Sequence, residues 1–103
     1  MKLDRIISGG QTGVDRAGLD AADALDLLTG GWCPRGRRAE DGRIPERYLL
    51  VEAPTADYTD RTHRNVVDAD ATLVLTEGSP GTGSGLTIRI AEQSGKPCLH
   101  VDL

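Results

Sequence analysis

The sequence predicts an α/β fold in which helices flank a mostly parallel sheet. Short apolar runs alternate with longer stretches whose apolar residues recur at helical spacing. The short runs are rich in β-branched residues and Leu and do not alternate with polar residues, as is typical of parallel strands buried on both faces. Two glycine-rich loops each follow such a run and precede a helical pattern. Together these observations predict consecutive strand–loop–helix units.

Length and composition limit the classes of protein that fit. The chain has 103 residues and a formal net charge of −4, so we expect one domain spanning residues 1–103, without nucleic-acid or membrane partners. The chain has no Phe, one Trp and two Tyr, which leaves a core of Leu, Val, Ile and Ala. No stretch resembles a signal peptide or a membrane span, and Cys33 and Cys98 form no CxxC motif. We therefore expect a cytoplasmic protein with reduced thiols.

The first half of the chain combines short strands with one long helical pattern. Apolar residues from Val14 to Leu28 recur at helical spacing, and the pair Gly30-Gly31 follows as the expected stop. Pro and Gly in the arginine-rich loop predict irregular backbone there. The expected elements are, in order, a strand at Lys2–Ser8, a helix at Val14–Leu28, a strand at Gly31–Cys33, a loop at Pro34–Pro45 and a strand at Tyr48–Glu52.

The second half repeats the alternation more clearly. Asp57 or Asp60 provides a helix cap, the run Ala71–Thr76 has high strand propensity, and Gly95 ends the last helix. The expected elements are a helix at Asp57–Val67, a strand at Ala71–Thr76, a helix at Gly85–Ser94 and a strand at Pro97–Val101. This order predicts a Rossmann-like sheet.

The two glycine-rich loops predict a phosphate site. Glycine allows positive φ and a close approach of backbone N–H groups, and the following helix adds unpaired donors and a partial positive charge. If the strands ending at Ser8 and Thr76 are neighbours, both loops line one crevice. The candidate binding residues are Ser8, Gly9, Gly10, Gln11, Thr12, Gly13 and Arg16 with the first loop, and Gly81, Thr82, Gly83, Ser84 and Gly85 in the second. The alternative is that these glycines only serve tight turns.

Neither loop matches a better-known nucleotide motif. The first lacks the Lys-Ser/Thr pair that ends a P-loop, and the pattern Gly81-x-Gly83-x-Gly85 is one residue short of GxGxxG. No acidic residue about 20 positions after the first loop ends a clear second strand, where it would hold a ribose. P-loop ATP hydrolysis and ordinary NAD binding are therefore disfavoured.

Arginines gather in the loop that follows the second short strand. A guanidinium can bind phosphate through two parallel hydrogen bonds, so we include Arg35, Arg37 and Arg38 among the candidate binding residues. The alternatives are a solvated loop in which these arginines pair with Glu40 and Asp41, or an oligomer contact.

Metal-binding and catalytic residues are not assigned. Cys33 could offer a thiolate to a metal ion, but most intracellular cysteines in such positions are simply packed. His63 and His100 have no partner at ligand spacing, and no nucleophile–base pair is visible. The sequence therefore favours binding over catalysis.

Four motifs lie between residues 7 and 73: ISGGQTGVDRA at 7–17, GGWCPRGRRAEDG at 30–42, Arg61-Thr62 with Asn65-Val66, and DATL at 70–73. In these motifs the sequence resembles the putative molybdenum carrier family. That family is similar to molybdenum cofactor carrier proteins and to the lysine-decarboxylase-like phosphoribohydrolases. The resemblance implies a three-layer α/β fold, a homo-oligomer and a phosphate-bearing small-molecule ligand, either the molybdenum cofactor (molybdopterin) or a nucleotide. Family members usually run on past the position of Leu103, so we expect a missing segment either to remove part of the pocket or to be replaced by a partner subunit.

The comparison with the phosphoribohydrolases argues against hydrolysis. Their loop reads Gly-Gly-x-Gly-Thr-x-x-Glu, and aligning its last glycine with Gly85 places Arg89 at the catalytic Glu. The leading hypothesis is a binding protein for a phosphate-bearing ligand. The alternatives are a nucleoside-monophosphate phosphoribohydrolase, with Glu40, Asp41 or Glu46 as its acid, and a nucleotide-sensing regulatory subunit.

Overall fold

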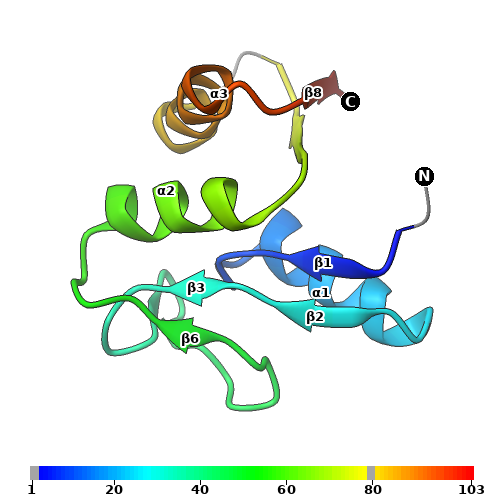
Figure 1. Ribbon diagram of the computed structural model, residues 1–103. Helices are drawn as coiled ribbons and strands as arrows, with labels where there is room; N and C mark the ends of the chain where they lie inside the picture. Colours follow the sequence, from blue (N-terminus) through cyan, green and yellow to red (C-terminus); the bar gives the residue numbers. More distant parts are fainter. Residues whose placement is uncertain (1–2, 79–80) are drawn as a thin grey trace. The chain divides into compact units, whose positions relative to one another are not determined.

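A computed structural model of the chain describes residues 3–78 and 81–103. The elements divide between two compact units, residues 1–61 and 62–103, and the boundary falls inside helix α2 (Figure 1). Each unit has a hydrophobic cluster of its own. The organisation of residues 1–103 as one domain stays a prediction.

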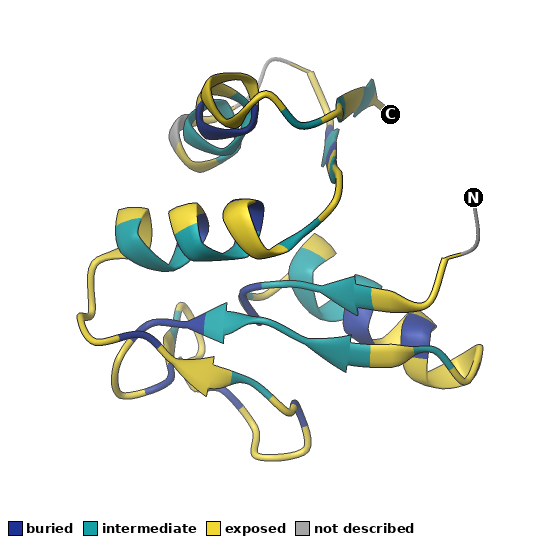
Figure 2. Ribbon diagram, in the orientation of Figure 1, coloured by how far each residue is buried: buried dark blue, intermediate teal, exposed yellow. Residues whose placement is uncertain are grey.

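The first unit opens with a strand–helix–strand segment made of β1 (Arg5–Ile7), α1 (Val14–Ala24) and β2 (Leu28–Gly30). β1 and β2 pair in parallel, which requires a crossover connection such as α1. The apolar stripe of α1 forms at helical spacing and buries Leu19 and Ala22 (Figure 2). This segment places the first glycine loop between β1 and α1.

The rest of the first unit contains four very short strands. They are β3 (Trp32–Cys33), β4 (Arg38–Ala39), β5 (Gly42–Arg43) and β6 (Val51–Glu52). β3 pairs in parallel with β6, whereas β4 and β5 form an antiparallel hairpin. The core of the unit packs Leu19 against Cys33, Ile44 and Tyr48. Ile44 and Tyr48 come from the segment between β5 and β6, so this segment is held to α1 by apolar packing.

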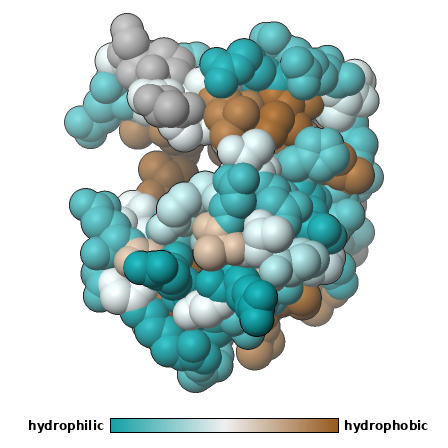
Figure 3. Space-filling model, turned by 90° about the vertical axis from the view of Figure 1, so that its left-hand side faces the viewer, coloured by the Kyte–Doolittle hydropathy of each residue, from teal (hydrophilic) through white to brown (hydrophobic). Residues whose placement is uncertain are grey.

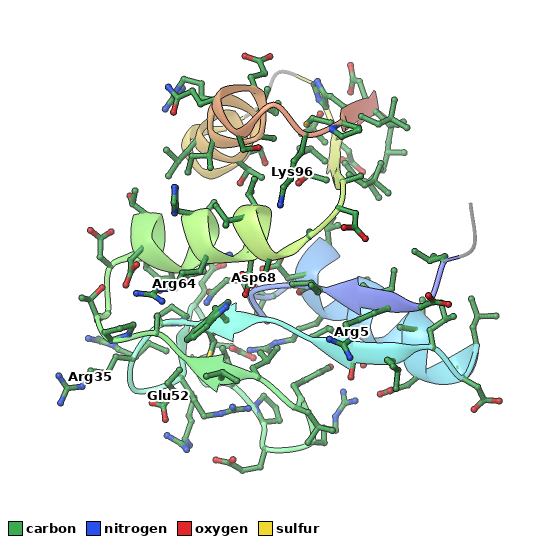
Figure 4. The ribbon with its side chains drawn as sticks, viewed as in Figure 1. Arg5, Arg35, Glu52, Arg64, Asp68 and Lys96 are labelled. Atoms are coloured by element: carbon green, nitrogen blue, oxygen red, sulfur yellow. The ribbon has the colours of Figure 1, made fainter. Side chains whose placement is uncertain are left out.

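The second unit contains most of α2 (Tyr58–Asp68), followed by β7 (Thr72–Thr76), α3 (Thr82–Ser94) and β8 (Cys98–Asp102). β7 and β8 pair in parallel, and Val66 of α2 packs with Ile90 and Ala91 of α3. Lys96 points toward the end of α2 (Figure 4), where its ammonium donates to the carbonyls of Val67 and Ala69. The side chain thus caps the carboxyl end of this helix.

Several predicted elements are confirmed. The helix predicted at 57–67 is α2, and Asp57 caps it by accepting a hydrogen bond from the Thr59 N–H at 2.9 Å. The strands predicted at 71–76 and 97–101 are β7 and β8 with shifts of one residue at their ends. The predicted third helix is α3, which ends at Gly95 in the left-handed conformation (φ 74°).

The predicted end of the first helix, Leu28, is wrong. α1 ends at Ala24, and Leu28–Gly30 is strand β2 rather than the last helical turn before Gly30-Gly31. The helix closes in a Schellman motif, in which the Leu27 N–H donates to the Ala22 carbonyl and the Asp26 N–H to the Asp23 carbonyl. Asp26 takes the left-handed conformation (φ 57°) that glycine usually provides. The stop was missed because the residue there is an aspartate.

The segment predicted to be an irregular loop at 34–45 contains the hairpin of β4 and β5, with Glu40 and Asp41 at its turn. Two predicted strands are also shorter than expected. The first covers only Arg5–Ile7, with Lys2 outside the described residues, and the predicted strand at 48–52 is reduced to Val51–Glu52. Among the helices that the structure describes, none combines the length and the apolar character needed to cross a membrane.

Candidate phosphate-binding site

The first glycine loop, Ser8–Gly13, leaves the end of β1 and leads into α1. The Ser8 hydroxyl accepts a hydrogen bond from the Gly10 N–H at 3.2 Å and donates to the Asp15 carbonyl at 2.9 Å. Gly10 has φ 75° and Gly13 φ 84°, in the left-handed region where glycine is favoured. The loop is therefore held in one conformation by its own hydrogen bonds.

Packing also requires glycine in this loop. Gly9 and Gly10 are both buried. A Cβ on Gly9 would overlap the Arg61 guanidinium, and a Cβ on Gly10 would overlap the side chain of Leu50. Glycine at these two positions is thus explained by close neighbours, so it is not by itself evidence for a ligand.

The amino end of α1 has no side-chain cap. Its N-cap is Gly13, which makes no side-chain cap hydrogen bond. The Asp15 carboxylate in the first turn accepts a hydrogen bond from the Gln11 N–H at 3.1 Å. A carboxylate near this end is stabilised by the helix dipole. The loop therefore already binds one negative group of its own.

The β4–β5 hairpin is tied to the glycine loop through side chains. Arg16 donates two hydrogen bonds to the Asp41 carboxylate, at 2.6 and 2.9 Å, and a third to the Gly10 carbonyl at 2.9 Å. The Gln11 side-chain amide donates to the Arg38 carbonyl at 2.9 Å. Arg16 therefore positions the Gly10 peptide and joins the loop to the hairpin.

This ion pair shifts the titration of both partners. Hydrogen bonds from the Arg16 guanidinium hold the pKa of Asp41 below its ordinary value of 3.8, and the same contact raises the pKa of Arg16. The folded state thus favours the ionised Asp41 carboxylate more than the unfolded state does. Its contribution to stability is complete above pH 3.8 and is lost as the pH falls through the lowered pKa.

We expect Asp41→Asn to lower the free energy of unfolding at pH 7, because the charge of the Arg16 partner is removed. The difference from wild type should shrink as the pH falls from 3.8 through the lowered pKa of Asp41, below which the wild-type carboxyl is protonated too. Urea unfolding between pH 7 and pH 3 measures this. Asp23→Asn, which removes an exposed carboxylate from α1, is the control. A difference that stays constant with pH would contradict the role of the charge.

The arginines predicted to bind the ligand differ in their surroundings. Arg35 lies at the outer end of its loop and points away from the ribbon (Figure 4), and Arg38 is exposed on β4. Arg37 is only 5% exposed, and its guanidinium donates to the carbonyls of Ile44, Pro45 and Tyr48 at 3.2, 2.8 and 2.9 Å. Arg37 therefore holds residues 34–48, the hairpin segment, in place. Ligand roles for Arg35, Arg37 and Arg38 stay predictions.

The second glycine loop belongs to the second unit, and its residues Ser79 and Pro80 lie outside the described residues. The loop leaves β7 with the Gly78 N–H donating to the Asp102 carboxylate at 2.6 Å. α3 starts after Gly81, which has extended backbone and no side-chain cap hydrogen bond. The first turn of α3 is Thr82, Gly83, Ser84 and Gly85. A Cβ on Gly81 or Gly83 would meet no atom of the described residues within 4 Å, so packing against these residues does not explain glycine there. A shared crevice for both loops stays a prediction.

Cys33 fits the prediction of a packed cysteine. It is fully buried in the core of the first unit, and burial raises the pKa of its thiol. In the part of the chain that the structure describes, no three His, Cys, Asp or Glu side chains are grouped to hold a metal ion.

Comparison with known families decides the relationship. Residues 6–103 match the family described as the circularly permutated YpsA SLOG family. The chain belongs to this family. No curated protein matches this chain.

The solved structures include a similar protein, the putative molybdenum carrier protein from Syntrophus aciditrophicus SB. It is 55% identical, with a TM-score of 0.96, and the match covers 98% of this chain. The chain spans 64% of the length of that protein. This likeness confirms the predicted α/β, Rossmann-like class and the resemblance to the molybdenum carrier family.

One residue beside the first loop of this SLOG family member was not among the predicted binding residues. Arg61 lies in the first turn of α2, and its guanidinium covers Gly9. Its Nη1 is 3.7 Å from the Asp15 carboxylate, and its Cζ is 5.6 Å from the centre of the Tyr58 ring. The motif containing Arg61 supported the family resemblance, but no spacing in the sequence places this side chain on a loop 52 positions earlier. The structure therefore adds Arg61 to the surroundings of the first loop.

Proposed function

We propose that the protein binds a phosphate-bearing small molecule, either the molybdenum cofactor or a nucleotide, at its glycine loops. The observation that supports this most is shared by α1 and α3: each begins at a glycine that makes no side-chain cap hydrogen bond. First-turn N–H groups without a cap are donors for an anion, which the helix dipole also stabilises. Arg16 and the candidate arginines of the hairpin segment would add positive charge beside the first loop.

The choice of ligand is proposed from the likeness to the Syntrophus protein, whose name is that of a molybdenum carrier. Molybdopterin and nucleotides share a phosphate and a flat ring system, so both suit the same type of loop. Native mass spectrometry of the protein purified from its own host, with elemental analysis for molybdenum, tests the choice. A bound mass with molybdenum supports the cofactor, and a nucleotide mass supports the other ligand. Purified protein that carries neither and binds neither would overturn the proposal.

We expect Gly83→Val to weaken binding of AMP by about tenfold or more, which is the loss of one or two charge-assisted hydrogen bonds. The β-branched side chain would stand where backbone N–H groups meet phosphate oxygens. Stability should hardly change, because a Cβ at this position meets no described atom within 4 Å and Val is no worse than Gly in a helix. Isothermal titration with AMP and thermal unfolding measure the two effects.

Gln93→Val is the matched control, because it adds the same side chain at an exposed position toward the other end of α3. Equal AMP affinity in Gly83→Val, Gln93→Val and wild type would show that the second loop is only a turn. Gly10→Val is a poorer test than the sequence alone suggests, since its side chain would overlap Leu50 and lower stability as well.

We further propose that the protein carries its ligand without converting it, forms a homo-oligomer and lies in the cytoplasm. An apolar sheet face supports association, because Leu73 of β7 and Leu99 of β8 are register partners and are 58% and 61% exposed. Such a face is usually covered by another surface. Release of free base from nucleoside monophosphates at enzymatic rates would favour the hydrolase in place of the carrier.

A further inference from the structure

Arg61 occupies a position that is costly for a purely structural arginine. It lies in the first turn of α2, where the helix dipole disfavours a positive charge. Its side chain is only 17% exposed, and its Nε is buried without a hydrogen-bond partner in the described part of the chain. Buried donors are nearly always paired, so an unpaired one indicates a missing acceptor.

The neighbouring carboxylate only partly satisfies this charge. Asp15 Oδ2 is 3.7 Å from Arg61 Nη1, beyond the 2.7–2.9 Å typical of a charge-assisted hydrogen bond. The same oxygen accepts the Gln11 N–H at 3.1 Å. Asp15 thus already accepts a hydrogen bond from the loop, and Arg61 Nε has no acceptor among the described residues.

The surroundings of Arg61 suit an oxyanion. The guanidinium lies against the backbone of Gly9 at the start of a loop that leads to the uncapped amino end of α1. Figure 3 shows mostly hydrophilic side chains in the lower part of that view. A tetrahedral anion offers two oxygens to adjacent guanidinium donors while its others face backbone N–H groups.

Resting on the proposed function, we propose that Arg61 binds the terminal phosphate of the ligand at the first loop and that Asp15 competes with this phosphate for the guanidinium. The ligand class is a phosphate monoester. Binding moves Arg61 from its long contact with Asp15 to a bidentate contact with the phosphate. Free tetrahedral oxyanions share the chemistry, so inorganic phosphate and molybdate serve as separate probes, and adenosine serves as the probe without phosphate.

The test is isothermal titration of AMP, phosphate, molybdate and adenosine into wild type, Arg61→Gln, Arg61→Lys and Asp15→Asn. Arg5→Gln is the matched control, because it removes an exposed arginine from the end of β1 far from the loop along the strand. We expect Arg61→Gln to lower AMP affinity roughly tenfold or more, Arg61→Lys to lower it less, and Arg5→Gln to leave it unchanged. Asp15→Asn keeps an acceptor for the Gln11 N–H but loses the charge, so AMP affinity should rise.

The outcomes separate the two proposals. If wild type binds AMP and Arg61→Gln binds it equally well, Arg61 is structural and this inference is wrong, while the proposed function stands. If Arg61→Gln does not fold, Asp15→Asn decides: unchanged or lower AMP affinity contradicts the competition. Tighter binding of phosphate or molybdate than of AMP would replace the monoester by a free oxyanion and overturn the assignment. If wild type binds none of the probes, both proposals fail.

Discussion

Gly31→Ala should lower the free energy of unfolding by about 3 kcal/mol or more, a large share of the roughly 5–15 kcal/mol that stabilises a typical domain. Gly31 has φ 131°, a conformation that L side chains rarely adopt. Its Cβ would also overlap the Ser8 carbonyl oxygen and lie 2.9 Å from the Ser8 nitrogen. These are backbone atoms, so no side-chain rotation can relieve the overlap. Urea unfolding followed by circular dichroism measures the loss.

Gly42→Ala separates the two causes of this effect. Gly42 also has positive φ (112°), but a Cβ there would meet nothing within 4 Å. Its cost should be limited to backbone strain, about 1–2 kcal/mol. If Gly31→Ala costs no more than Gly42→Ala, the close approach of Gly31 to Ser8 is not what requires glycine.

Arg37→Met should lower the free energy of unfolding by about 1–3 kcal/mol even though it replaces a charged residue by an apolar one of similar length. Arg37 donates to the carbonyls of Ile44, Pro45 and Tyr48 in the interior of the first unit. Without the guanidinium the Pro45 and Tyr48 carbonyls keep only the N–H groups of Tyr48 and Leu50, and the Ile44 carbonyl loses the donor it has in the described part of the chain. Thermal and urea unfolding of the variant measure the loss.

Arg43→Met is the matched control for Arg37→Met. Arg43 pairs with Glu46 at 2.6 Å, but both side chains are exposed, so this surface ion pair contributes little to stability. Equal losses in the two variants would show that the carbonyl contacts of Arg37 carry no special weight.

Local signals account for the elements that the sequence predicts correctly. β7 has five consecutive residues of high strand propensity, and α3 ends at a glycine in the left-handed conformation. The end of α1 was not predicted, because Asp26 takes the left-handed conformation without being a glycine. The β4–β5 hairpin was not predicted, because two-residue strands of Arg, Ala and Gly show no alternation of apolar and polar residues. Buried contacts from Arg37 hold this segment, and they belong to the tertiary structure.

In the candidate site, too, local features were predicted from the sequence and tertiary contacts were not. Glycine loops followed by helices are visible in the sequence, because backbone conformation is a local property. Four arginines within nine residues look alike in the sequence, yet Arg37 is buried and Arg35 and Arg43 are exposed. Arg61 reaches Gly9 only after the chain has folded, so no spacing rule could have placed it there.

The hydrogen bonds that fix the first loop also affect the thermodynamics of binding. Ser8, Asp15 and Gln11 restrain the backbone from Ser8 to Gly13 before any ligand arrives. The conformational entropy of this segment, about 1–2 kcal/mol per residue, is thus given up during folding and not during association. A ligand that meets a loop ordered in advance keeps more of its interaction energy as affinity. Variants that loosen the hairpin should therefore weaken binding through entropy, with the contacts of the bound state intact.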